Sequence, residues 1–218
     1  MTQLRFTPVA DYALLVGFDD ISEPAEVLGA VQALDRAIRL AQPSAVLETA
    51  PALVNLIVRF DPLSSNHADV ADVISTLTID DSITTNPTEH HLTVTYGGAA
   101  GPDLDAVAEA TGLDTAAVVD AHVATPLTVQ MYGFAPGYAY LGDLPEQLHL
   151  PRKPQPVRDV PAGSVIIANN QCLVTTITMP TGWWIIGHTE DQVLTPAAAR
   201  PAIFEPGDLV HFHRNLRA

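Results

Sequence analysis

The stretch Leu127-Thr-Val-Gln-Met-Tyr-Gly-Phe-Ala-Pro-Gly-Tyr-Ala-Tyr140 sets the pattern for the second half of the chain. Its first six residues, 127–132, form an apolar segment with the length of a strand, and the two glycines and the proline that follow permit a tight loop. Short apolar segments separated by Gly and Pro continue from this loop toward the C-terminus, at residues 164–168, 173–178, 184–187 and 209–213. This succession of short strands predicts a small closed or nearly closed β-barrel.

The composition of the chain changes near residue 90. Only two of the 13 glycines lie before that position, whereas 12 of the 18 prolines lie after it. The segment 78–90 is mostly polar and contains a turn signal at Asn86-Pro87. We therefore place a domain boundary here, with residues 1–88 as a first domain and residues 89–218 as a second.

The first domain alternates strand-like and helix-like segments. Residues 22–41 have apolar side chains three and four apart, with Ser22 as a candidate cap and Pro24 in the first turn, which is typical of an amphipathic helix. Asn66 is the candidate cap of a second helix. The segments follow the order β-α-β-β-α-β, over residues 12–18, 22–41, 44–49, 53–60, 66–77 and 92–96. This order predicts a ferredoxin-like fold, so we expect the whole chain to be of the α+β class.

Charge and cysteine content limit the partners of this chain. The formal net charge is -15, from 25 acidic residues against 10 basic ones, of which only Lys153 is a lysine. Because nucleic acids and anionic membranes are bound through clustered Lys and Arg, we expect neither as a partner. The single cysteine, Cys172, cannot form an internal disulfide, and the dispersed histidines supply no recognised metal-ligand set, so we expect no metal. Without a signal-like start or an apolar run of membrane-spanning length, a cytoplasmic protein is expected.

Three aromatic side chains project from the glycine-rich loop at residues 133–140. Phe134, Tyr138 and Tyr140 can form a flat wall for a planar amide or a nucleotide base. The same residues can instead pack against one another at a corner of the barrel, which is the more frequent use of aromatic side chains. Both interpretations stand, and under the first one these three residues bind substrate.

A proline-rich basic loop follows at residues 151–158, Pro-Arg-Lys-Pro-Gln-Pro-Val-Arg. The prolines stiffen the loop, so Arg152 and Arg158 are expected to lose little entropy when they bind a ligand. Arginine forks match the geometry of carboxylate and phosphate groups, which makes this loop the best candidate anion site in an acidic chain. The alternative is surface ion pairing with the nearby acidic residues Asp143, Glu146 or Asp159.

Two further residues are candidates for proton transfer. Asp103 lies at the start of a predicted helix, where N-capping is the ordinary role of an aspartate. His122 lies inside the next predicted helix, where a histidine is commonly a hydrogen-bonded packing residue, although it can titrate near neutrality. His211 and His213 are two apart, so both are expected on one solvated face of a strand.

Several motifs of nucleotide-binding and hydrolytic enzymes are missing from the sequence. It contains no GxGxxG motif, no phosphate-cradling GxxxxGK motif and no Gly-x-Ser-x-Gly around a nucleophilic serine. Gly182-Trp183-Trp184 places two tryptophans where a strand begins, either in the core or on a surface that meets a partner.

Taken together, these motifs resemble those of the allophanate hydrolase subunit 1 family, also called the KipI or PxpB family. The resemblance covers the whole second part of the chain, and the first part agrees in layout. The motifs that carry it are Gly98-x-x-Gly-Pro-Asp-Leu104, His122, Gly133-Phe-x-Pro-Gly-Tyr-x-Tyr-Leu141, Pro151-Arg152, Arg158, Val160-Pro-Ala-Gly-Ser-Val165, Gly182-Trp183, Gly187-x-Thr189 and Gly207-Asp208.

The resemblance implies a ferredoxin-like N-terminal domain, a cyclophilin-like β-barrel and a role as an enzyme subunit. Family members are the B subunit of ATP-dependent 5-oxoprolinase, which opens the lactam of 5-oxoproline to give glutamate. This implies ATP as co-substrate of the complex, no metal held by this chain, and a partner of the KipA or PxpC type (allophanate hydrolase subunit 2), with or without a third subunit. The implied site residues are Arg152 and Arg158 on a carboxylate or phosphate, Phe134, Tyr138 and Tyr140 along the pocket, and Asp103 and His122 in proton transfer.

Two other functions stay open beside this one. Some members of the family are described as inhibitors of a sporulation histidine kinase, which requires only a binding surface. A barrel that binds proline-containing peptides is the third alternative, by analogy with cyclophilins. The chain also departs from the usual family pattern, with Thr175 and Thr176 in place of Tyr-Pro, Thr181 in place of glycine, and His188 in place of arginine. These departures predict altered contacts with the substrate or cofactor.

Overall fold

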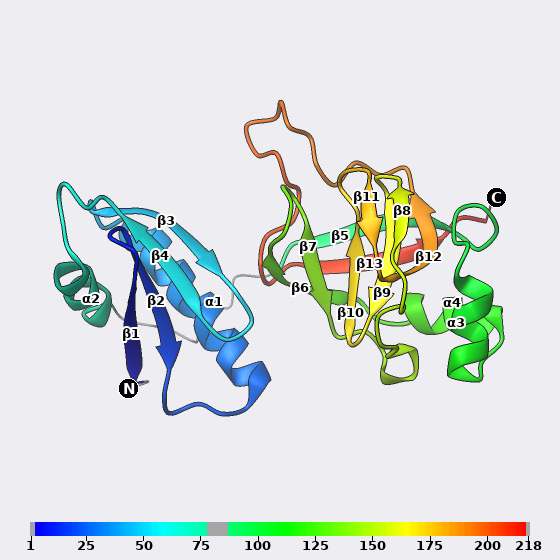
Figure 1. Ribbon diagram of the computed structural model, residues 1–218, viewed down its shortest axis with the longest axis horizontal. Coiled ribbons are helices and arrows are strands. Elements are labelled where there is room, and N and C mark those ends of the chain that lie inside the picture. The colour runs from blue at the N-terminus through cyan, green and yellow to red at the C-terminus, as the bar shows by residue number, and fades with distance from the viewer. Residues whose placement is uncertain (1–2, 78–86, 217–218) are drawn as a thin grey trace. The chain divides into compact units, whose positions relative to one another are not determined.

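The structure is a computed structural model that describes residues 3–77 and 87–216 (Figure 1). The chain divides into two compact units, residues 1–86 and residues 87–218. The predicted boundary segment, residues 78–90, lies for the most part outside the described residues. Within the described residues, no helix has both the length and the apolar character needed to cross a membrane.

The first unit is a four-stranded sheet with two helices. Its elements are β1 (Leu4–Val9), β2 (Ala13–Phe18), α1 (Pro24–Ala41), β3 (Val46–Pro51), β4 (Leu56–Phe60) and α2 (His67–Ser75). The strands stand in the order β1-β2-β4-β3, and each is antiparallel to its neighbour. The core joins β2, β4 and the apolar face of α1, and it includes the fully buried side chains of Leu14, Leu34 and Leu56.

The predicted β-α-β-β-α-β order is wrong in its last strand. Residues 92–96 lie in β5 (Glu89–Tyr96), which belongs to the second unit, and the sheet position beside β2 is filled by β1. All six residues of β1 pair with β2, from Leu4 opposite Phe18 onward. Most side chains of β1 are exposed and one of them is a proline, which is uncommon in strands. The sequence of β1 therefore predicts a strand only weakly, and β1 is held in the sheet by its pairing with β2. The observed order is two strands, a helix, two strands and a helix.

The two helices of the first unit begin at different signals. The residue before α1 is Glu23, not the predicted cap Ser22; it makes no side-chain cap bond, and Pro24 takes the first helical position. Asn66 caps α2 as predicted. Its side-chain oxygen accepts hydrogen bonds from the backbone N–H groups two and three residues further on, at 2.9 and 3.1 Å.

The second unit contains a closed β-barrel, which confirms the predicted architecture of this part. Its remaining elements are α3 (Leu104–Thr111), α4 (Thr115–Val123), β6 (Leu127–Tyr132), β7 (Ala139–Gly142), the 3-10 turn η1 (Glu146–Leu148), β8 (Val157–Val160), β9 (Ser164–Ala168), β10 (Gln171–Val174), β11 (Met179–Thr181), β12 (Trp184–Thr189) and β13 (Leu209–Arg214). Seven strands close in the order β10-β7-β6-β13-β5-β12-β9, while β8 and β11 pair separately (Figure 1). β13 runs parallel to β5, and the other neighbours are antiparallel.

β9 is buried on both faces and separates two apolar clusters. Val165 and Ile167 belong to the larger cluster, which also takes in α3, α4 and most other barrel strands. Because side chains alternate along a strand, Ile166 and Ala168 point the opposite way and join a smaller cluster that includes Trp183. The glycine-rich loop and the β8–β11 sheet contribute to this smaller cluster, so the candidate site is built on a face of the barrel.

Candidate functional site

The predicted aromatic residues form a continuous row that ends at an arginine. Ring centroids are separated by 5.5 Å between Phe134 and Tyr138, by 5.9 Å between Tyr138 and Tyr140, and by 6.0 Å between Tyr140 and Trp183. At the far end, the Arg152 guanidinium carbon lies 5.7 Å from the centroid of the Trp183 ring, which is a cation–π distance. We call these five residues the aromatic row. The structure thus brings together four of the residues predicted to bind substrate.

The loop that carries the aromatic row is closed by its own backbone. The N–H of Gly133 donates to the carbonyl of Tyr138 at 3.1 Å, and the N–H of Tyr138 donates to the carbonyl of Ala135 at 3.1 Å. Phe134 has a φ of 71°, in the left-handed region that a bulky side chain rarely adopts, and its side chain is 77% exposed. An exposed aromatic residue held in a costly backbone conformation is a typical feature of a binding site.

The two interpretations of the aromatic residues apply to different members of the row. Tyr138 and Trp183 are buried in the smaller apolar cluster, as a barrel corner requires. Burial, followed by the neighbouring Tyr140, raises the pKa of Tyr138 to about 12, so its hydroxyl stays protonated. Phe134 is exposed and Tyr140 is half-buried, so these two keep aromatic surface open to solvent.

Asp103 occupies the predicted N-cap position of α3 but makes no cap hydrogen bond. Its Oδ2 instead accepts a hydrogen bond from Lys153 Nζ at 2.5 Å and one from the backbone N–H of Ile185 at 2.8 Å. The side chains of Lys153 and Asp103 are only 9% and 20% exposed. The expected capping role is therefore wrong, and the carboxylate joins the basic loop to β12 in a largely buried ion pair.

The start of the basic loop is fixed to residues 182–184 by two more hydrogen bonds. The backbone N–H of Lys153 donates to the carbonyl of Gly182 at 2.7 Å, and Nε1 of Trp184 donates to the carbonyl of Pro151 at 2.8 Å. Lys153 Nζ also lies 6.0 Å from the centroid of the Trp184 ring. Three motifs that are distant in the sequence, at Asp103, at residues 151–153 and at residues 182–184, meet here.

Arg152 and Arg158 have different surroundings. Arg152 stacks on Trp183, whereas Arg158 is exposed on β8, whose residue Val157 pairs with Thr181 of β11. Within the described part of the chain, neither arginine forms an ion pair with the acidic residues weighed as alternatives, Asp143, Glu146 and Asp159. Both guanidinium groups therefore keep their hydrogen-bonding edges for another partner.

His122 lies apart from the aromatic row, fully buried in the larger apolar cluster. Its Nδ1 is 2.8 Å from the hydroxyl of Tyr96, and its Nε2 is 3.3 Å from Sγ of Cys172. Burial lowers the pKa of His122 to about 3 and raises the pKa of both Tyr96 and Cys172. All three groups are neutral, which is the packing role, and proton transfer to a substrate at His122 would require the barrel to open.

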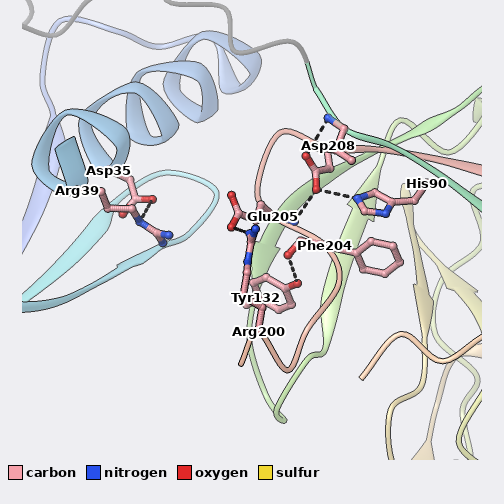
Figure 2. A network of polar contacts seen from close by, with 9 residues as sticks. Asp35, Arg39, His90, Tyr132, Arg200, Phe204, Glu205 and Asp208 are labelled. Carbon is pink, nitrogen blue, oxygen red and sulfur yellow. Dashed lines mark hydrogen bonds and ion pairs between the residues drawn. The ribbon is translucent and has the colours of Figure 1, made fainter. Parts of the chain in front are cut away.

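The Gly207-Asp208 motif ties two strand ends together, as Figure 2 shows. The buried Asp208 carboxylate lies 2.9 Å from Nε2 of His90 and accepts the backbone N–H groups of Thr88 at 3.1 Å and Glu205 at 2.8 Å. The hydroxyl of Tyr132 donates to the carbonyl of Phe204 nearby. This motif therefore fixes the starts of β5 and β13 and has a structural role.

His91 of the neighbouring strand β5 lies beside His211 and His213 on the predicted solvated face of β13. The His91 ring stacks on those of His211 and His213, with centroids 4.7 and 5.2 Å apart, and His91 Nδ1 lies 2.9 Å from His213 Nε2. His211 Nε2 is also 3.3 Å from the Glu89 carboxylate. Across residues 3–77 and 87–216, no set of three or more His, Cys, Asp or Glu is arranged to hold a metal ion.

Lys153 and Trp183 complete the site although the sequence does not predict them as binding residues. The one feature of the sequence that draws attention to Lys153 is that it is the only lysine of the chain. Its partner, Asp103, is 50 positions away, and no local pattern connects the two residues. Trp183 follows a glycine at a strand start, and only the fold shows that it extends the aromatic row.

The fold and the site define the chain as a carboxyltransferase-type domain. The family described as carboxyltransferase domain, subdomain C and D, matches residues 4–204, and the chain belongs to this family. Within it, the relatives are those of the allophanate hydrolase subunit 1 (PxpB) family that the sequence motifs indicate.

Two curated relatives carry the same name, the B subunit of 5-oxoprolinase. Over 119 residues the chain is 48% identical to this protein from Escherichia coli O157:H7, a match that covers 55% of this chain and 55% of that protein. This match thus spans about half the length of the relative. Over 221 residues the chain is 33% identical to the B subunit from Bacillus subtilis (strain 168), which covers 94% of this chain and 90% of the relative.

Three solved structures are similar to this chain. The conserved uncharacterized protein PH0987 from Pyrococcus horikoshii is 34% identical, with 97% of each chain covered and a TM-score of 0.58. TTHA0988 is 28% identical with a TM-score of 0.81, and the match covers 93% of this chain and 39% of TTHA0988. The Kluyveromyces lactis urea carboxylase, at 14% identity and a TM-score of 0.76, shares the fold over 99% of this chain and 22% of its own length.

Proposed function

We propose that this chain is one subunit of a heteromeric, ATP-dependent amide hydrolase that opens the lactam of 5-oxoproline or a close relative. The observation that carries the proposal is the match to the B subunit of Bacillus subtilis 5-oxoprolinase over 94% of this chain and 90% of that protein. A match of this extent reaches into both units of the chain.

The aromatic row supports a small planar substrate with an acidic group. Phe134 and Tyr140 offer aromatic surface to a flat five-membered lactam ring, and Arg152 holds a guanidinium at the end of the same row. A guanidinium fork matches a carboxylate in geometry and charge, and stacking on Trp183 fixes the plane of the fork. Arg158, exposed on β8, is the second residue we propose for this anion.

The Asp103–Lys153 pair keeps the basic loop in position beside this row. Because the pair is largely buried and Asp103 also accepts the N–H of Ile185, moving Lys153 would leave a carboxylate without its cation. We therefore assign Asp103 a positioning role, which sets where Arg152 stands, in preference to proton transfer.

We propose that the reaction takes place in a cytoplasmic complex with a KipA or PxpC-type subunit and, in a three-part enzyme, one more subunit. ATP would transfer its γ-phosphoryl group to the lactam carbonyl oxygen with ADP as the leaving group. Water would then complete the cleavage of the ring C–N bond, which gives glutamate and releases the phosphoryl group as inorganic phosphate. The chain alone is expected to be inactive. Mixing it with the partner should give one heteromeric peak on size exclusion, and two separate peaks at micromolar concentration would contradict the complex.

The test is ATP hydrolysis that depends on 5-oxoproline. The chain is combined with its purified partner subunits, and phosphate release and glutamate formation are measured with and without 5-oxoproline. The proposal expects both products in equal amounts, and only when this chain is present. A stable complex that never releases phosphate or glutamate would rule out the hydrolase role and favour the regulatory alternative, binding to a histidine kinase.

A further inference from the structure

Three threonines, Thr175, Thr176 and Thr181, stand at positions where the family pattern has other residues. The proline usual at position 176 cannot donate a hydrogen bond from its side chain, and the glycine usual at position 181 has no side chain to accept one. Hydrogen bonds of the hydroxyls at these two positions are therefore specific to this sequence. Both hydroxyls have partners in the structure, and these partners lie in the segments that carry the aromatic row.

Thr176 holds the aromatic loop at the Phe134 end of the row. Its Oγ1 donates to the carbonyl of Pro136 at 2.8 Å. Leu194 packs against the next residue of the loop, Gly137, where a Cβ would come within 2.8 Å of Leu194 Cδ1. These two contacts fix the backbone directly after Phe134, whose own φ of 71° is unfavourable. The exposed Phe134 ring therefore stands on a backbone that Thr176 and Leu194 keep in place.

Thr181 holds the backbone at the other end of the row. The residue is 5% exposed, and its Oγ1 accepts the backbone N–H of Trp183 at 3.1 Å. The Trp183 ring lies at a cation–π distance from the Arg152 guanidinium. The Thr181 hydroxyl thus fixes the backbone from which the ring next to Arg152 projects.

The other two departures from the family pattern have different contacts. The Thr175 hydroxyl donates to the carbonyl of Pro161 at 2.7 Å and accepts the N–H of Ser164 at 2.9 Å, in the turn before β9. His188 Nε2 lies 3.4 Å from the carboxylate of Glu190, a side chain that is 96% exposed. Neither of these contacts involves a residue of the aromatic row. The departures that act on the two ends of the row are therefore those at positions 176 and 181.

We propose that Thr176 and Thr181 are positioning residues, which set the spacing between the Phe134 ring at one end of the aromatic row and the Arg152 guanidinium at the other. The departures at these positions act on the site without touching a ligand. At position 176 a hydrogen bond stands where the family has a rigid proline, and at position 181 a side-chain acceptor stands where it has a permissive glycine. Only the identity of the ligand on the row rests on the proposed function.

The first test is amide hydrogen exchange on the isolated full-length chain, without ATP or a partner. Thr176→Val keeps the shape of the side chain but removes its hydroxyl. The N–H groups of Gly133 and Tyr138, which close the aromatic loop, should then exchange about three- to tenfold faster, as expected for the loss of one hydrogen bond. Thr176→Ser keeps a hydroxyl and should restore the slower exchange.

Thr181→Val is the matched change at the other end of the row. It removes the acceptor of the Trp183 N–H, which should exchange about three- to tenfold faster, whereas Thr181→Ser should not change it. The control is Thr178→Val, the same change at an exposed position between the two threonines, which should leave these exchange rates unaltered. Unaltered exchange in Thr176→Val, at a half-buried side chain, would overturn the proposal even if Thr181→Val does not fold.

The second test separates positioning from a general loss of stability. In the reconstituted complex, Thr176→Val should raise the KM for 5-oxoproline about three- to tenfold and change kcat less than twofold, because a binding surface is displaced and the reacting groups are not. In a Phe134→Ala background the same change should not raise KM further, because the ring on which Thr176 acts is gone.

A full additional rise of KM in the Phe134→Ala background would overturn the proposal, because Thr176 would then act independently of the ring. The exchange measurements do not depend on the reaction. The expected exchange rates in a chain whose complex never hydrolyses ATP would remove the proposed function and leave the positioning roles of Thr176 and Thr181 supported.

Discussion

Asp103 and His122 lie near each other in sequence and start as equal candidates for proton transfer, yet the fold gives them opposite surroundings. The Asp103 carboxylate is partly exposed and paired with the Lys153 cation, beside the aromatic row. His122 is fully buried and forms its hydrogen bonds with Tyr96 and Cys172, both uncharged. One region keeps its charges and the other excludes them.

The difference shows how burial without a counter-charge decides the state of a titratable group. The desolvation cost lowers the pKa of a histidine that has no carboxylate nearby, whereas the Asp103 carboxylate lies 2.5 Å from the Lys153 ammonium group as one half of an ion pair. Of these two regions, the one around Asp103, Lys153 and Arg152 contains the charged groups. The predictions below test this division.

The largest expected effect is on stability at the neutral region. His122→Ala should lower the free energy of unfolding by about 2–4 kcal/mol, because it leaves a cavity and an unpaired Tyr96 hydroxyl in the core. The folded variant should keep its activity in the complex. Urea unfolding followed by tryptophan fluorescence measures this effect, since both tryptophans lie in the second unit. Unchanged stability together with lost activity would show that His122 is catalytic, and the contrast between its region and that of Asp103 would be wrong.

Within the charged region, a change at Arg152 should affect activity rather than stability. Arg152→Lys keeps the charge but loses the fork and the stacking on Trp183, so kcat/KM of the reconstituted complex should fall about 10- to 100-fold. The melting temperature and the elution of the complex are the controls.

Arg158→Lys is the matched variant on the same loop. A loss of the same order places Arg158 in the anion site, and a loss below about fivefold leaves it as a surface residue. If neither lysine variant changes kcat/KM while both complexes stay intact, the anion site is wrong.

Asp103→Asn should give a moderate effect on both properties. The amide still accepts the N–H of Ile185 but leaves the largely buried Lys153 without its counter-charge, which we expect to cost about 1–2 kcal/mol, because the pair is partly open to solvent. A double-mutant cycle with Lys153→Met measures the coupling between the two residues. Strict additivity, with no coupling, would show that the pair does not hold the loop.

The smallest expected effect is a pH dependence from His122. The unfolded chain binds a proton at this residue near pH 6.5, whereas the folded chain does so only near pH 3. The unfolded state therefore binds more protons between these values, and stability falls as the pH falls below 6.5. From pH 6.5 to 5.5 this group should account for about 1 kcal/mol of lost stability. The loss is measured as the difference between the parent chain and His122→Ala, and two parallel pH profiles would contradict it.

Local patterns predicted much of the second unit. Short apolar segments between Gly and Pro correctly indicated β6, β9, β12 and β13, which are four of the seven strands of the closed barrel. They missed β7, β8 and β11, which are only three or four residues long and carry too few residues for a periodic signal. In the first unit, β1 was missed and β5 was given to the wrong sheet, because pairing partners are not encoded in the strand itself.

By itself, the sequence determined the family through its motifs, the barrel of the second unit, and the aromatic loop at residues 133–140. Tertiary structure alone decided that Asp103 meets Lys153 and that His122 is buried between the uncharged Tyr96 and Cys172. The physical reason is that residue type and spacing set local conformation. The charge state and accessibility of a side chain depend instead on neighbours that only the folded chain brings within a few ångströms.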